Sequence, residues 1–284
     1  MHGARQSAKR STATSAGSPS WGVHDHAGVL PGTLLTAEFV RPHLRRRAAR
    51  LLEVGAGDGD LAAHLDGKGV QVVALDHDHR MIERAKSRGR TVLWADWPHF
   101  KADGFDVVLF SRSLHHMDDL GAAVVRALQL LRRRGVVLVE EFAAEAVDSI
   151  CMAWLAGVVT GLAAAGRTPR RRGFLARLLG DRDPLEAWSR EHAGVHAATA
   201  IAASLLAHSR VRFAGQAPYL FRYFDEYEPA AQRIVLAAEA SRIRRGLLPA
   251  VGRRFVLDQR PDARRGRRPT RQTPGPGPTL EPEC

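Results

Sequence analysis

Short apolar runs alternate with helical patterns between residues 51 and 140, and this alternation restricts the fold more than any other feature of the sequence. The runs are rich in Val, Leu and Phe, which is typical of strands, and the segments between them have apolar residues at helical spacing. We therefore expect strands at 51–54, 70–75, 91–94, 105–110 and 135–140, and helices at 59–66, 78–87 and 120–131. Because the strands are apolar throughout, they predict a mostly parallel sheet covered by helices on both faces.

The rest of the chain is predicted to be a cap, an edge and two tails. Residues 143–210 have a helical pattern, which indicates a helical cap inserted near the end of the sheet. Residues 211–224 predict two antiparallel edge strands, and residues 229–246 predict the last helix. We expect one folded domain over 21–258. The flanking segments 1–20 and 259–284 have the Ser, Pro, Gly and Arg bias typical of a disordered leader and a disordered basic tail.

Composition restricts the setting of the protein more than its chemistry. The formal net charge is +12, but the arginines are dispersed, so they favour neither nucleic acid nor an anionic membrane surface strongly. Cys151 and Cys284 are the only cysteines, which fits a reducing cytoplasm, and no apolar run follows the basic N-terminus as in a signal peptide. The apolar stretch 149–166 contains many small residues and is predicted to be a buried helix and no membrane span.

A glycine-rich turn follows the first predicted strand. In the segment LLEVGAGDGD, Glu53 precedes Gly55, Gly57 and Gly59, and Asp60 stands where a dinucleotide-binding fingerprint would have its third glycine. Glycines allow a sharp turn and close approach of a ligand, and the next helix offers free N–H groups. The spacing E-x-G-x-G-x-G resembles motif I of class I S-adenosylmethionine-dependent methyltransferases. The alternative is a tight strand-to-helix turn that binds no ligand.

This resemblance implies a Rossmann-like, doubly wound, mostly parallel seven-stranded α/β sheet that binds S-adenosyl-L-methionine. Asp76 would hold the ribose hydroxyls, with Asp78 as a second choice, although an Asp after a strand is often a helix cap. Asp96 would contact the adenine amino group, and Trp97 would lie against the purine ring or in the core. The implied cofactor-binding residues are Glu53, Gly55, Ala56, Gly57, Asp76, His77, Asp96, Trp97, Ser111 and Arg112.

The segment FDVVLFSRSLHHMDD also resembles small-molecule methyltransferases of this superfamily, in which it follows the fourth strand and ends in Leu-His-His. Ser111 and Arg112 would line the methionine end of the cofactor. His115 and His116 are candidate bases, because histidine accepts a proton near neutral pH. Glu141 is a third candidate that could hold an acceptor amine or hydroxyl from the rim; alternatively, it starts a solvated helix.

Two further clusters carry weaker signals. Trp21, His24, Asp25 and His26 belong to a segment that in this superfamily often folds over the cofactor. His-Asp-His without a fixed helix or strand is a poor ligand set, so no metal is predicted. A second cluster, at four-residue spacing, consists of Tyr219, Tyr223 and Tyr227. These tyrosines could line the pocket, although such a stripe more often belongs to the core.

The predicted function is methyl transfer from S-adenosylmethionine to a small-molecule acceptor in the cytoplasm, with the acceptor atom left open. RNA or protein remain alternative acceptors, although no NPPY-like or catalytic-cysteine motif follows the fourth strand. A non-enzymatic interaction module on the same fold is a further alternative. A nicotinamide-dependent oxidoreductase is disfavoured by Asp60 and by the lack of a Tyr-x-x-x-Lys pair.

Overall fold

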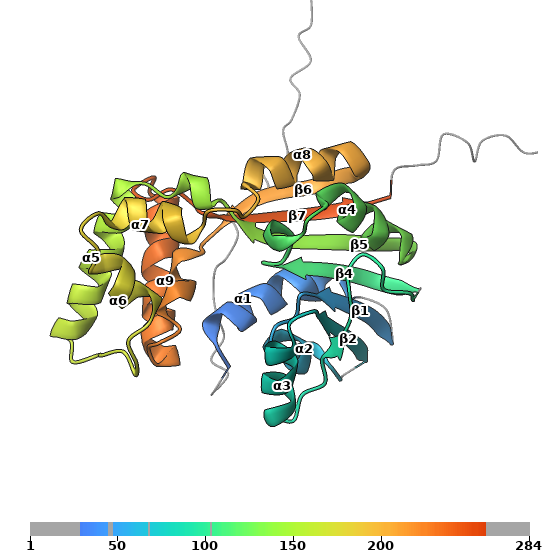
Figure 1. The fold of residues 1–284 in the computed structure, drawn as a ribbon, viewed down its shortest axis with the longest axis horizontal. Coiled ribbons are helices and arrows are strands. Elements are labelled where there is room, and N and C mark those ends of the chain that lie inside the picture. The colour runs from blue at the N-terminus through green and yellow to red at the C-terminus, as the bar shows by residue number, and fades with distance from the viewer. Residues whose placement is uncertain (1–28, 45–47, 68, 103, 260–284) are drawn as a thin grey trace, which may run out of the picture.

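A seven-stranded sheet forms the centre of the protein (Figure 1), in the order β3-β2-β1-β4-β5-β7-β6. The computed structural model describes residues 29–44, 48–67, 69–102 and 104–259. Strands β1 to β5 are parallel, whereas β7 is antiparallel to both β5 and β6. The strands are β1 Ala49–Val54, β2 Val70–Asp76, β3 Leu93–Trp94, β4 Phe105–Ser111, β5 Leu131–Phe142, β6 Arg210–Ala217 and β7 Gly252–Asp258.

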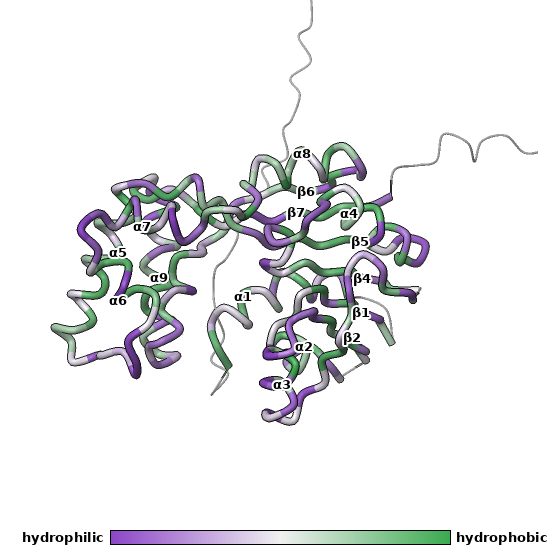
Figure 2. The backbone as a smooth tube through the Cα atoms, in the orientation of Figure 1, coloured by the Kyte–Doolittle hydropathy of each residue, from purple (hydrophilic) through white to green (hydrophobic). Residues whose placement is uncertain are grey.

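Helices cover both faces of the sheet, so the predicted doubly wound α/β fold is confirmed. On one face, Leu52 and Phe110 pack with residues of α4 and α8. On the other, Leu51 and Leu109 pack with residues of α1 and α2. Successive strand residues point to opposite faces, which explains why β1 and β4 are apolar throughout. Figure 2 shows the hydrophobic colouring of much of the central strands. The helices are α1 Pro31–Val40, α2 Asp60–Leu65, α3 His79–Ser87, α4 Leu120–Gln129 and α8 Ala198–His208.

A second, helical lobe stands beside the carboxyl ends of the parallel strands (Figure 1). It has its own core, which includes Trp154, Leu175, Trp188 and Val235 and reaches Leu35 of α1. Its elements are α5 Ser149–Ala164, α6 Phe174–Leu179, α7 Pro184–Glu191, the 3-10 helix η4 Leu220–Phe224 and α9 Pro229–Arg244. The remaining 3-10 helices are η1 Arg41–His43, η2 Leu114–His116 and η3 Ala144–Ala146.

The lobe and the sheet edge differ from the sequence expectations. Helix α8 belongs to the span 143–210 that was expected to form the cap, but it packs on the sheet against α4. Helix α9 lies outside that span, yet it packs in the lobe. Of the two antiparallel edge strands expected in 211–224, only the first is found: β6 lies at the edge of the sheet and pairs with β7, whereas 220–224 is a 3-10 helix. The stretch 149–166 forms a helix with one buried and one exposed face. Within the described residues, no helix is long and apolar enough to cross a membrane.

Candidate active site

Two cavities lie at the carboxyl ends of the parallel strands, beside the point where strand order reverses around β1. The larger, of about 640 Å³, extends from the glycine turn to the helical lobe. The smaller, of about 130 Å³, lies at the ends of β1 and β2, between the segments 95–97 and 116–118. Gly55 and His116 line both cavities, so the two form neighbouring parts of one site.

The glycine turn after β1 has a backbone that only glycine adopts easily. Gly55 and Gly57 have φ values of +73° and +58°, in the left-handed region where a Cβ is disfavoured. A Cβ on Gly55 would also lie 2.5 Å from the Cβ of Ser113. The Ser113 hydroxyl donates to the carbonyl of Val54 at 2.7 Å and braces the turn from the β4 side.

Asp76 ties the end of β2 to the glycine turn. Its Oδ2 accepts the N–H of Gly57 at 2.7 Å, and its Oδ1 accepts the N–H of Asp78 at 2.9 Å. Asp76 lines the smaller cavity beside the exposed His77. Asp78 instead caps α3 by accepting the N–H of Arg80 and lies outside both cavity linings. The structure therefore favours Asp76 over Asp78 as the carboxylate of the site.

Glu53 lies at the floor of the larger cavity and is 3% exposed. Its Oε2 has no hydrogen-bond partner among the described residues. Burial raises the pKa of Glu53 to about 8, against the opposing influence of Arg112. A buried acceptor without a partner is costly. Such an acceptor at a cavity floor suits a ligand that brings a cationic N–H donor.

The far end of the smaller cavity is lined by Asp96 and Trp97. The Trp97 ring meets Phe110 edge to face, with ring centroids 5.6 Å apart, and its Nε1 has no partner among the described residues. Asp96 is exposed and contacts His99 at 2.8 Å. A half-buried ring beside an accessible carboxylate can hold a flat heterocycle that carries an amino group.

Ser111 and Arg112 close the end of β4 and line the larger cavity. The Ser111 hydroxyl is buried without a partner among the described residues. Arg112 has a left-handed φ of +59°, and its N–H donates to the Glu140 carbonyl at 2.7 Å. A non-glycine residue in this region is strained, and such strain is concentrated at functional sites.

The three expected catalytic residues occupy different positions. His115 and His116 both line the larger cavity, and burial lowers the pKa of His116. Glu141 is fully buried and absent from that lining, so the expected rim position for it is not found. Glu141 instead contacts His115, with Oε2 2.7 Å from Nδ1. It therefore acts on the cavity only through this histidine.

Sequence reasoning missed most of the wall opposite the glycine turn. This wall comes from segments far apart in the chain and carries no motif; its residues are Phe142, His192, Tyr219, Phe221, Arg222 and Tyr223. Of the three expected tyrosines, Tyr219 and Tyr223 line the cavity, whereas Tyr227 lies in the lobe core. The cluster around Trp21 falls outside the described residues.

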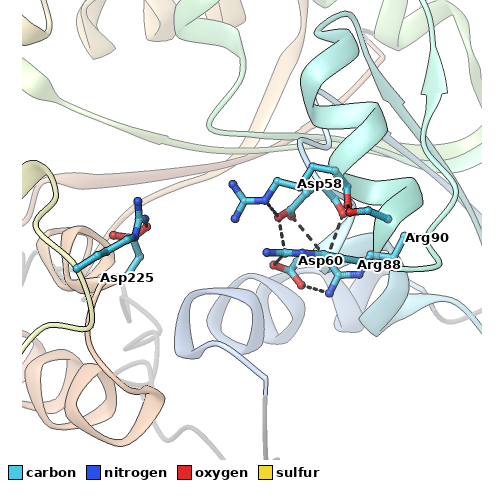
Figure 3. Close-up of polar contacts among 8 residues, drawn as sticks. Asp58, Asp60, Arg88, Arg90 and Asp225 are labelled. Carbon is cyan, nitrogen blue, oxygen red and sulfur yellow. Dashed lines mark hydrogen bonds and ion pairs between the residues drawn. The ribbon is translucent and has the colours of Figure 1, made fainter.

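Charged residues surround the mouth of the larger cavity. Asp58 and Asp60 bind Arg88 and Arg90 beside α2, and Asp225 lies across the opening (Figure 3). The Asp58 Oδ2 to Arg88 distance is 2.6 Å, and the Asp60 Oδ1 to Arg90 distance is also 2.6 Å. These pairs are part-exposed, so they fix side-chain positions more than they stabilise the fold.

Comparison with known proteins identifies relatives of part of the chain. An uncharacterized methyltransferase of Mycobacterium tuberculosis is 34% identical over 98 residues, which is 32% of this chain and 50% of the relative. The 27-O-demethylrifamycin SV methyltransferase of Amycolatopsis mediterranei is 30% identical over 143 residues, 43% of this chain and 52% of the relative. The chain thus spans about half the length of the curated relatives it matches.

A structural neighbour and a family profile complete the comparison. The structure of coclaurine N-methyltransferase bound to N-methylheliamine and SAH has a TM-score of 0.49 and 11% identity, over 83% of this chain and 75% of that one. The profile described as "Methyltransferase domain" matches residues 33–184, more than half of the chain. This range contains the glycine turn, Asp76, Asp96 and the His115–Glu141 pair. The chain therefore belongs to the methyltransferase domain family, the class I enzymes that use S-adenosyl-L-methionine.

Proposed function

We propose that this protein transfers the methyl group of S-adenosyl-L-methionine to a small-molecule acceptor. The observation that carries the proposal is the joint geometry of Glu53, Gly57 and Asp76. The turn at Gly57 is bonded to Asp76 at 2.7 Å, and beside it the buried Glu53 carboxyl has an oxygen without a partner among the described residues. Glu53, the turn at Gly57 and Asp76 could each contact a methionine nucleoside, and they are gathered at the ends of the adjacent strands β1 and β2.

The polar groups of the two cavities fit this cofactor. Glu53 would accept the N–H groups of the methionine ammonium, and Asp76 would accept ribose hydroxyls with its remaining lone pairs. Asp96 would accept the adenine amino group, and Trp97 would contact the ring. Each of the three carboxyl groups would accept a hydrogen bond from a donor of the ligand, which supports the two cavities as one cofactor site.

When bound, the cofactor supplies a methyl group already activated by its sulfonium, for in-line displacement by the acceptor. The protein must then hold the acceptor in line and exclude water. Correct orientation of two bound reactants can remove about 7–11 kcal/mol from a barrier. The cavity wall that includes Phe142, Tyr219 and Tyr223 would position the acceptor. His115 would take the proton of the acceptor if the acceptor group is a hydroxyl.

The size of the larger cavity supports a small acceptor. Its volume of about 640 Å³ falls within the range of roughly 300–1,000 Å³ that is usual for small-molecule pockets. Residues of the helical lobe line this cavity together with the glycine turn, among them Phe221 and Tyr223 of η4. The relative from Amycolatopsis mediterranei is named for 27-O-demethylrifamycin SV, which agrees with an acceptor of this kind.

Calorimetric titration with S-adenosylhomocysteine tests the proposal. We expect micromolar binding by the unaltered protein and a loss of about 100-fold or more in Asp76→Ala, since charged hydrogen bonds each contribute about 1.5–3 kcal/mol. Asp78→Ala is the matched control, because Asp78 lies two residues away and only caps α3. No binding by the unaltered protein would refute the enzyme proposal and favour an interaction module.

A further inference from the structure

The wall of the larger cavity opposite the glycine turn is aromatic. We use "aromatic wall" for Phe142, His192, Tyr219 and Tyr223. Phe142 and Tyr219 are stacked, with ring centroids 4.6 Å apart and planes 9° apart, and Phe142 meets His192 edge to face at 5.5 Å. The Tyr223 hydroxyl lies 3.0 Å from His192 Nε2. These side chains hold one another in place and present a rigid surface to an aromatic ring.

His115 stands beside this wall with a defined ring orientation. Its ring meets Phe142 edge to face at 4.9 Å, and its Nδ1 lies 2.7 Å from Glu141 Oε2. The other oxygen of Glu141 accepts the N–H of Leu114 at 2.7 Å, so the carboxyl is fixed at both oxygens. With Nδ1–H donating to Glu141, the neutral ring has its lone pair on Nε2. His115 can therefore accept a proton from a group in the cavity.

Guanidinium groups line the larger cavity together with His115 and the aromatic wall. Arg112 lines the cavity and makes no ion pair within 4.0 Å among the described residues, and Arg222, which also lines it, bonds the carboxylate of Glu140. The carboxylates at the mouth are already paired with arginines, namely Asp58, Asp60, Asp225 and Glu191 with Arg88, Arg90, Arg171 and Arg177. Guanidinium groups repel an ammonium acceptor and stabilise an oxygen that gains negative charge.

We propose that the acceptor is a phenol, methylated on its oxygen, with His115 as the base; this rests on the proposed function. The phenolic O–H gives its proton to Nε2 of His115 as the oxygen bonds the methyl carbon. The carbon–sulfur bond breaks, and its electron pair remains on sulfur as a neutral thioether. The imidazolium later releases the proton to water. Glu141 positions His115 through its contact with Nδ1.

Acidity separates a phenol from an aliphatic alcohol at this site. An ordinary imidazole has a pKa of about 6.5 and a phenol about 10, whereas the O–H of water ionises near 15.7. Proton transfer from a phenol to an imidazole is thus far less uphill than from an aliphatic alcohol. The ring of a phenol also packs on the aromatic wall, which a saturated chain does less well.

The test compares matched rings that differ only in the acceptor group. Protein shown to bind S-adenosylhomocysteine is incubated with S-adenosylmethionine and para-cresol, para-toluidine or para-methylcyclohexanol, and the methylated products are measured by mass spectrometry. We expect the methyl ether of para-cresol at a rate at least about 10-fold above either alternative. Cofactor binding with preferred amine or alcohol methylation, or with no phenol methylation, overturns the phenol assignment alone. Absence of cofactor binding overturns the proposed function as well.

Substitution of His115 tests the role of the base. We expect His115→Ala to lower kcat/KM for para-cresol by about 10²- to 10⁴-fold while S-adenosylhomocysteine affinity changes little. The loss should be much smaller for para-nitrophenol, which is already ionised near neutral pH. His208→Ala is the matched control, because His208 is exposed at the end of α8. Equal losses for both phenols, or none for para-cresol, would contradict the role of His115.

Discussion

Three buried glutamates differ in their pKa values because their partners differ. Burial raises the pKa of Glu53 to about 8, since it has no counter-ion that outweighs desolvation. Burial also acts on Glu140, but Arg254 and Arg222 lower its pKa more strongly, to about 2. Glu239 is raised by burial to about 7, against three backbone N–H donors. The position of each partner thus decides which carboxyl carries charge at neutral pH.

The raised pKa of Glu53 predicts that cofactor binding releases a proton. Near neutral pH this carboxyl is mostly protonated, and a ligand ammonium would favour its ionised form. Affinity for S-adenosylhomocysteine should therefore rise with pH up to about 8 and level off above that value. Calorimetry in buffers of different ionisation enthalpy should detect the release of up to one proton.

Glu53→Gln is the control for this linkage. It keeps the size of the side chain but cannot ionise, so we expect weaker binding without proton release from this group. An equal proton release in Glu53→Gln and in the unaltered protein would show that another group titrates on binding.

At the scale of elements, the carboxylate of Glu239 joins α9 to the aromatic wall. Glu239 is fully buried, and its two oxygens accept the N–H groups of Tyr219, Leu220 and Phe221 at 2.7, 2.9 and 2.8 Å. Helix η4 begins within this segment and carries Arg222 and Tyr223. A side chain on α9 thus sets the backbone from which part of the cavity wall extends.

Glu239→Gln should lower the free energy of unfolding by about 1–3 kcal/mol, because the amide nitrogen cannot accept the N–H of Phe221. Glu239→Ala leaves all three N–H groups without this partner and should cost more, roughly 3–5 kcal/mol. Urea denaturation measures both. Glu186→Gln on the exposed face of α7 is the control and should change stability by less than about 0.5 kcal/mol. Equal stability of Glu239→Gln and the unaltered protein would contradict the structural role of this carboxylate.

The sequence predicted elements best where local pattern and burial agree. Strands β1, β2 and β4 are apolar and lie within about two residues of their expected bounds. The strand β7 was missed because GRRFVLD has an apolar run of only Phe-Val-Leu between charged residues, and its pairing with β5 and β6 is set by contacts distant in sequence. Similarly, 220–224 looked like a strand, but Glu239, 18 to 20 residues away, accepts the N–H groups of Tyr219, Leu220 and Phe221 and holds the start of this segment in a turn.

The same limit applies to the site. The glycine turn, Asp76 and Asp96 follow consecutive parallel strands, so their spacing in the sequence predicts their meeting at one edge of the sheet. The aromatic wall contains Phe142 of β5 and His192 and Tyr223 of the lobe, and no periodicity in the sequence relates these positions. The interaction of Glu141 with His115 depends on the depth of β5, which the sequence did not reveal.

At the scale of the whole molecule, Glu140 joins the sheet to the cavity wall. It accepts hydrogen bonds from Thr36 of α1, Arg222 of η4 and Arg254 of β7. Its pKa, lowered from 4.5 to about 2, means that the folded state favours the charged form. This contribution to stability is therefore complete above about pH 4.5 and is lost as the pH falls toward 2.

Glu140→Gln should therefore flatten the acid limb of the stability profile. At neutral pH the substitution leaves Arg222 and Arg254 without their shared carboxylate, and we expect a loss of about 3–5 kcal/mol in the free energy of unfolding. The difference from the unaltered protein should shrink as the pH falls below 4.5. Urea denaturation across this pH range measures both effects. A difference that stays constant with pH would contradict the ion pairs of Glu140.

The core of the helical lobe includes residues of α1 and β5. We therefore predict that the lobe and the sheet unfold together and respond together to the cofactor. Leu35 of α1 and Phe142 of β5 belong to the same buried cluster as the lobe residues Trp154 and Trp188. A ligand at 100 times its Kd stabilises the folded state by about 2.7 kcal/mol, so a single melting transition should rise by roughly 5–10 °C with S-adenosylhomocysteine. Calorimetric scans of the unaltered protein should show this shift, and Asp78→Ala should keep it. Asp76→Ala should lose it. Two melting transitions, of which only one responds to the ligand, would mean that α1 and β5 do not couple the lobe to the sheet. The aromatic wall would then move independently of the cofactor site.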